Sequence, residues 1–115
     1  MATASVIIPT HGRPEKLERC IESIGRQRLA SGDSIEVIVA IDGAICGDES
    51  AVVETTDRIT RIRLPRVGVS AARNAAIELA RGEFLLFVND DCYPDIDWAG
   101  LHIAAQRRQP TRFKI

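Results

Sequence analysis

The feature that most constrains the fold is a regular alternation between short apolar runs and longer segments of helical periodicity. Apolar runs occupy residues 5–8, 35–41 and 84–88, and they are too short and too continuous to be amphipathic helices. Helices are predicted between and after them, from Pro14 to about Gln27, from Val69 to Ala80 and from Trp98 to Arg107. Such alternation predicts a parallel sheet with right-handed crossovers, and therefore a three-layer α/β sandwich.

Four local features carry further predictions. Residues 50–56 are predicted as a short helix, and residues 61–64 as a further strand near a sheet edge, which Pro65 ends. Gly82 is predicted to be the left-handed C-cap of the helix before it. The last helix is predicted to place Trp98, Leu101 and Ala105 on one side.

Length and composition indicate one ordinary globular domain. The chain has 115 residues, with an expected core over 4–105 and a tail over 106–115. Aromatic residues make up only 4%, so the core must rest on Ile, Val, Leu and Ala. A net charge of -1 lacks the strongly basic character of a nucleic-acid binder, so no nucleic-acid partner is expected.

The cysteines and the two ends of the chain bear on the compartment. The three cysteines are widely spaced, which favours neither a disulfide framework nor a zinc site and is typical of a cytoplasmic protein. The start resembles no signal peptide, and no apolar run approaches the roughly 20 residues of a membrane span. The tail is basic, and it is either solvated or weakly attracted to an anionic membrane. Its basic residues are Arg107, Arg108, Arg112 and Lys114.

Polar residues follow three of the predicted strands. Thr10 and His11 follow the first strand, Asp42 follows the second, and Asn89-Asp90-Asp91 follows the strand at 84–88. In parallel sheets ligands bind outside the carboxyl ends of the strands. We therefore expect these groups to converge on one rim of the sheet.

The acidic turn is the strongest of these signals. Two adjacent carboxylates, Asp90 and Asp91, repel each other unless a cation or hydrogen-bond donors offset the repulsion. Such oxygen ligands suit Mg²⁺ or Mn²⁺ bound together with substrate phosphates. A solvated turn that simply ends the strand explains the same residues equally well.

The other polar residues have functional and purely structural interpretations. Asp42 either opens an Asp-Gly turn or accepts a hydrogen bond from a ligand N–H. Arg73 either pairs with Asp42, or steadies a base, or is solvated on a helix whose N-cap is Ser70. His11, taken alone, is more typical of a solvated loop residue, and Cys92 of a small buried residue. The Gly-x-Gly-x-x-Gly and Walker-type loops are absent.

Together the motifs resemble those of family 2 glycosyltransferases, and they occur in the family's order from residue 4 to about 105. The matching strings are Ser5–Pro14, Leu17–Gln27, Ile35–Gly43, Gly68–Ile77, Gly82–Cys92 and Asp95–Trp98. The resemblance implies the Rossmann-like N-terminal half of a GT-A domain. It also implies a nucleotide-sugar donor, often a UDP-sugar, a divalent Mn²⁺ or Mg²⁺ ion and inverting transfer.

The resemblance also assigns residue roles. Pro9, Thr10 and His11 would line the base pocket. Asp42 would bind the base and Arg73 would support that pocket. Asp90 would contact the ribose or the metal, and Asp91 would bind the metal.

Three departures from the family pattern qualify these roles. Asn89 stands where the metal motif usually begins with Asp, so metal binding is expected to persist but to be weaker. Ile41 replaces the first of two acids, and the chain ends about halfway through a family catalytic domain. The acceptor site and the carboxylate general base would lie in the missing half.

These departures leave a donor-binding half, with a non-catalytic nucleotide-binding or assembly module, or a remnant, as the alternative. A receiver-like signalling domain is disfavoured, because the acidic pair it needs after the first strand is replaced by Pro9-Thr10-His11. The strand at 84–88 is expected to have an exposed edge, which predicts a homodimer.

Overall fold

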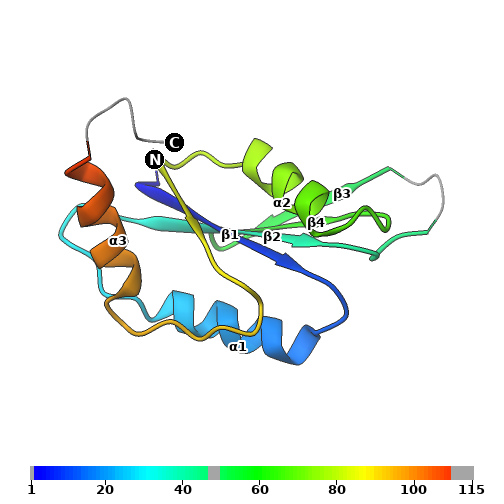
Figure 1. Ribbon diagram of the computed structural model, residues 1–115, viewed down its shortest axis with the longest axis horizontal. Helices are drawn as coiled ribbons and strands as arrows, with labels where there is room; N and C mark the ends of the chain where they lie inside the picture. Colours follow the sequence, from blue (N-terminus) through cyan, green and yellow to red (C-terminus); the bar gives the residue numbers. More distant parts are fainter. Residues whose placement is uncertain (1, 47–49, 110–115) are drawn as a thin grey trace.

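The structure is a computed structural model that describes residues 2–46 and 50–109, and a five-stranded mixed sheet forms its centre (Figure 1). The strand order is β3-β4-β2-β1-β5. The strands are β1 (Ala4–Thr10), β2 (Ile35–Ile41), β3 (Val52–Thr56), β4 (Ile59–Arg63) and β5 (Phe84–Phe87). The helices are α1 (Pro14–Gly25), α2 (Val69–Glu78) and α3 (Trp98–Arg107).

Strand β1 lies at the middle of the parallel part of the sheet, and all seven of its residues are buried. It pairs with β2 on one side and with β5 on the other. The strand runs through Pro9 to Thr10, although Pro9 was predicted to stop it. The backbone N–H and C=O groups of successive residues point to opposite sides of a strand, and on this alternation the backbone of Pro9 faces β5. The pairing of β1 with β5 ends before Pro9, at Ile7 and Phe87. The missing N–H of Pro9 therefore removes no bond from the paired part of the ladder.

Helices cover both faces of the sheet, as predicted for a three-layer α/β sandwich (Figure 1). On one face α1 and α3 pack against alternate residues of β1, β2 and β5. On the other face α2 presents Ala72 and Ala76 to Ile7 and Ile38. Small alanine side chains let this helix lie close to the sheet.

The predicted helix at 50–56 is wrong, because these residues include β3, which pairs antiparallel with β4. Val52, Val53, Thr55 and Thr56 are β-branched and favour a strand. A two-residue turn, in which Asp57 and Arg58 both have positive φ values of 49° and 66°, joins the two strands. β3 is therefore the outer strand, and β4 lies next to it, near the sheet edge as predicted.

Gly82 was wrongly predicted as a helix cap. Helix α2 ends at Glu78 with Leu79 as its C-cap, and Gly82 is not among the glycines of positive φ. A Cβ at Gly82 would lie 2.5 Å from the carbonyl carbon of Ala4. The glycine is needed because two stretches of backbone approach each other closely there.

The predicted inner face of the last helix is also wrong. Leu101 is 68% exposed, whereas Ala99 and Ile103, four positions apart, are buried against the sheet. Nearby, Arg107 forms an ion pair with Asp33 at 2.6 Å. Arg112 and Lys114 of the predicted basic tail lie outside the described residues. Within residues 2–46 and 50–109, no helix has the length and apolar character needed to cross a bilayer.

Candidate functional site

The carboxyl ends of β1, β2 and β5 surround one hollow of about 420 Å³, as the strand-end pattern predicted. Its wall contains every predicted donor-site or metal-site residue except Arg73. The lining residues are Pro9, Thr10, His11, Arg13, Asp42, Arg66, Val69, Ala72, Asn89, Asp90 and Asp91. Residues far apart in sequence therefore come together at the rim because parallel strands end there.

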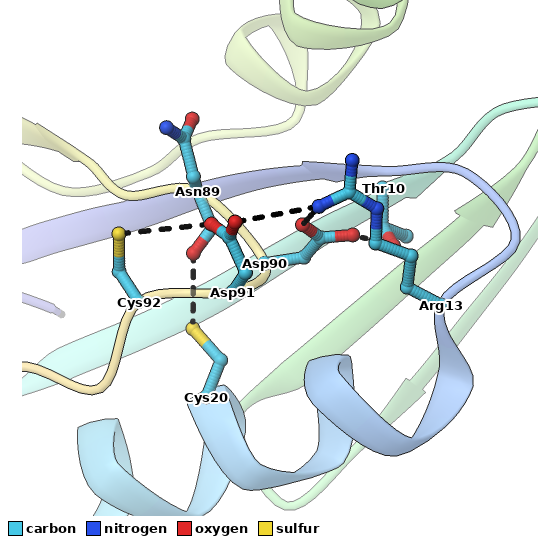
Figure 2. A network of polar contacts seen from close by, with 7 residues as sticks. All are labelled: Thr10, Arg13, Cys20, Asn89, Asp90, Asp91 and Cys92. Atoms are coloured by element: carbon cyan, nitrogen blue, oxygen red, sulfur yellow. Dashed lines mark hydrogen bonds and ion pairs between the residues drawn. The ribbon is translucent and has the colours of Figure 1, made fainter.

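The acidic turn that follows β5 is held by β1 and by the start of α1 (Figure 2). Asp90 is only 6% exposed, and its Oδ2 accepts a 2.7 Å hydrogen bond from the hydroxyl of Thr10. The N–H of Cys92 donates to the carbonyl of Asn89 at 3.1 Å, which closes the turn. The thiol of the buried Cys20 donates to the same carbonyl at 3.6 Å. The turn is therefore a positioned structure and not a loosely solvated one.

Arg13 supplies the cation that the two carboxylates require. Its Nη1 lies 3.5 Å from Oδ1 of Asp90 and 3.4 Å from Oδ2 of Asp91 (Figure 2). Arg13 was not among the site residues predicted from the sequence. The signal was present, since an adjacent acidic pair needs a counter-charge and Arg13 is the basic residue that ends the loop after β1.

Asp42 is 5% exposed and holds the loop that leads into α2. Its carboxylate accepts hydrogen bonds from the N–H groups of Val67 at 2.7 Å and Gly68 at 3.1 Å, and from Arg66 at 3.2 Å. Burial acts to raise the pKa of Asp42, but the two backbone donors and the charges of Arg66 and His11 outweigh it, so the pKa is lowered. Asp42 is therefore an ionised, pre-oriented acceptor.

His11 packs over the Asp42-Gly43 turn. Its Nδ1 donates to the carbonyl oxygen of Asp42 at 2.9 Å, so the imidazole carries a proton on that nitrogen. A Cβ at Gly43, whose φ is 77°, would lie 3.0 Å from Cε1 of His11. The Asp-Gly pair thus forms the predicted turn and also leaves room for the ring.

Arg73 does not line this hollow. The ion pair with Asp42 belongs to Arg66, and Arg73 lines an adjacent hollow that shares Pro9 and Asn89 with the first. The N-cap of α2 is Gly68 and not Ser70. The N–H of Gly68 donates to Asp42, whereas Arg73 lies further along, within the helix.

The acidic turn offers few protein ligands for a cation. No group of three or more His, Cys, Asp or Glu side chains suited to a metal occurs in the described part of the chain. Asp90 and Asp91 supply hard carboxylate oxygens, and Arg13 shows that a cation is electrostatically favoured between them. This donor set fits Mg²⁺ or Mn²⁺ held by two carboxylates with substrate phosphates and water. Cys92 is exposed, contrary to the prediction that it is buried, because it follows the closed turn and lines the adjacent hollow.

Comparison with known sequences gives a consistent picture. A model of the family described as "Glycosyl transferase family 2" matches residues 5–113. An uncharacterized glycosyltransferase EpsJ of Bacillus subtilis is 35% identical over 92 residues, which are 77% of this chain and 26% of that protein. Another from the same organism, YfnE, is 34% identical over 110 residues, or 92% of this chain and 27% of that protein.

Solved structures match as well. TarS residues 1–349 of S. aureus in complex with UDP align with a TM-score of 0.67 and 26% identity, over 92% of this chain and 32% of that one. The complex of the same fragment with UDP-GlcNAc aligns with a TM-score of 0.67 and 25% identity, over 92% and 31%. The chain thus spans about a third or less of the proteins it matches.

Proposed function

The chain belongs to glycosyl transferase family 2, and we propose that its rim hollow binds the nucleotide diphosphate of a sugar donor, specifically a UDP-sugar. Its α/β architecture resembles the GT-A glycosyltransferase TarS. The observation that carries the proposal is the convergence of Asp42, from the end of β2, with Asp90 and Asp91, from the end of β5, on one hollow. Support comes from the likeness to a structure solved with UDP, which extends over 92% of this chain.

The proposed roles follow the positions of the groups. Pro9, Thr10 and His11 line the base pocket, and Asp42 accepts a hydrogen bond from an N–H of the base. A carboxylate has about four acceptor positions, and the three bonds already present leave one for the ligand. Arg73 supports the pocket from the adjacent hollow, through the wall formed by Pro9 and Asn89.

Asp91 is proposed to bind a divalent Mn²⁺ or Mg²⁺ ion, and Asp90 to contact the ion or the ribose. Asp91 is the more accessible of the two, while Thr10 holds Asp90 in place. Such a metal would neutralise charge on the diphosphate leaving group. Asn89 offers an uncharged oxygen where the family usually has Asp, so we expect the metal to bind less tightly than in those relatives.

The whole reaction is proposed to be an inverting glycosyl transfer that needs more polypeptide than this chain. Deprotonation of the acceptor hydroxyl requires a general base, and the carboxylates at the rim are committed to hydrogen bonds, to Arg13 or to the metal. The alternative is a non-catalytic nucleotide-binding or assembly module. It is favoured by the hydrogen bonds and ion pairs that already engage the carboxylates at the rim.

Two further partners are proposed. β5 ends the sheet among the described strands, and an unpaired edge favours a homodimer. Light scattering that shows only monomer at high concentration would refute the dimer.

The basic tail is proposed to give weak association with anionic membranes. Cosedimentation with anionic but not neutral vesicles would test this.

Calorimetric titration with UDP in the presence of Mn²⁺ tests the donor site. The wild-type chain and a Glu83→Gln control should bind, whereas Asp91→Asn should lose most of the metal-dependent affinity. Absence of binding at millimolar UDP would contradict the proposal. Release of the sugar from UDP-GlcNAc would separate an active enzyme from a binding module.

A further inference from the structure

One nitrogen of Arg13 lies between the two carboxylates of the acidic turn. Its distances to Asp90 and Asp91, 3.5 Å and 3.4 Å, are at the outer limit of hydrogen bonding. The interaction is therefore mainly an attraction between charges and not a pair of tight, directional bonds. A divalent ion bound by both carboxylates would compete for the same oxygens.

The side chain of Arg13 is 50% exposed, and its hydrogen-bond partners within the described chain are the two carboxylates of the turn, Asp90 and Asp91. The residue precedes α1 with a non-helical backbone, at φ −131° and ψ 59°. Asp90 also accepts a 2.7 Å hydrogen bond from Thr10, and Asp91 accepts one from the thiol of Cys92 at 3.8 Å. Each carboxylate therefore has a hydrogen bond that does not involve Arg13.

We infer that Arg13 is an exchangeable counter-ion: it occupies the metal position while the hollow is empty and then transfers to the diphosphate of the donor. This inference rests on the proposed function. A dication between Asp90 and Asp91 repels the guanidinium, and Arg13 lines the same hollow that the diphosphate would enter. Arginine is well suited to the second role, because its planar donors match phosphate oxygens.

The exchange predicts that one substitution raises the affinity for Mn²⁺ alone and lowers the affinity for UDP. Arg13→Gln removes the competitor, so affinity for Mn²⁺ alone should rise by about two- to fivefold, the equivalent of one exposed ion pair. It also removes the phosphate contact, so affinity for UDP at saturating Mn²⁺ should fall by about ten- to a hundredfold. A residue with only a structural role would not strengthen one ligand while weakening the other.

Electron paramagnetic resonance of free Mn²⁺ and calorimetry with UDP measure the two affinities. Lys16→Gln removes a neighbouring charge that does not line the hollow, and it should change both affinities less than Arg13→Gln does. Arg13→Lys keeps the charge and should resemble the wild type with Mn²⁺ alone. Thermal melts check that each variant is folded.

The outcomes separate the two proposals. If the wild type binds neither Mn²⁺ nor UDP, the proposed function fails and the exchange fails with it. If the wild type binds UDP with Mn²⁺ but Arg13→Gln does not bind Mn²⁺ alone more tightly, the exchange is overturned and the donor site stands. The exchange is also overturned if Lys16→Gln changes both affinities as much as Arg13→Gln does, because the loss of any nearby positive charge would then explain the result.

Discussion

The hydroxyl of Thr10 donates a 2.7 Å hydrogen bond to Asp90, a residue 80 positions further along the chain. This bond joins the end of β1 to the turn that follows β5, and it is buried. The parallel pairing of the two strands brings these ends together, so the sheet itself determines where the acidic turn lies. The metal position proposed for Asp90 and Asp91 thus depends on a residue of the first strand.

Replacing Thr10 by Val removes this donor while nearly keeping the side-chain shape. We expect a loss of about 1–3 kcal/mol in the free energy of unfolding, because a buried carboxylate oxygen loses its partner. Thr10→Ser keeps the hydroxyl and should lose much less. Urea denaturation compares the two variants, and equal stability for them would show that the bond contributes nothing.

Asp42→Asn should destabilise the chain at neutral pH by about 1–3 kcal/mol, because the ionised acceptor of two backbone N–H groups is lost. The pKa of Asp42 is lowered from its ordinary 3.8, so its stabilisation is complete above that value and disappears as the pH falls through the lowered pKa. The difference between wild type and variant should therefore shrink in acid.

Denaturation curves from neutral pH to about pH 3 measure this difference. Arg66→Gln is the matched control: it removes only the exposed ion-pair partner of Asp42, so we expect a loss below about 1 kcal/mol. A difference between wild type and Asp42→Asn that does not change with pH would contradict the assignment of the stabilisation to the ionised carboxylate.

The sequence predicted the parts of the fold in which local pattern and tertiary environment agree. β2 is apolar on both faces because helices cover both, and its predicted range, 35–41, is confirmed. The prediction for residues 52–56 was wrong because β3 is fixed by its pairing with β4, and pairing between strands is not visible in a local pattern. The prediction that Gly82 caps a helix was wrong for a similar reason, since the backbone that it approaches belongs to β1.

The site was predictable where strand ends alone place it. Thr10, Asp42 and Asp91 each follow or end a strand, and the structure brings all three to one hollow. Arg13 and Arg66 were missed because their partners are decided by loop conformations. Residue type could not tell Arg66 from Arg73 as the partner of Asp42; the positive φ of Gly68 turns the loop toward that carboxylate.

Gly82→Ala should destabilise the chain by about 1–3 kcal/mol or more through a steric clash. The added Cβ would lie 2.6 Å from the backbone nitrogen of Ser5, and backbone cannot rotate away as a side chain can. Gly25→Ala is the control: open space surrounds it at the end of α1, so stability should rise by up to about 1 kcal/mol. Thermal unfolding would contradict the clash if both variants behaved alike.

Arg58→Gly should stabilise the β3–β4 turn by about 0.5–1 kcal/mol. Arg58 has a φ of 66°, which costs a residue with a Cβ more than it costs glycine. Its carbonyl would still accept the N–H of Val37, because that bond involves only backbone. Arg58→Ala keeps the unfavourable conformation and should give no gain. Stabilisation by alanine equal to that by glycine would show that loss of the charge is the cause.

Alkylation should distinguish the three cysteines. Burial, aided by Cys92 and by the negative charges of Asp90 and Asp91, raises the pKa of Cys20 to about 11, so it remains a protonated, unreactive thiol at neutral pH. Cys46 and Cys92 are exposed. Mass spectrometry after iodoacetamide treatment should show two adducts on the native chain and a third only in denaturant.

Cys20→Ala should give two adducts under both conditions, and rapid native labelling of Cys20 would contradict its burial. Because the Cys20 thiol donates to the carbonyl of Asn89, its exposure requires the acidic turn to separate from α1. The rate at which Cys20 reacts therefore measures the opening of the turn. If the turn forms the metal site, Mn²⁺ with UDP should slow that rate, and Asp91→Asn should abolish the protection.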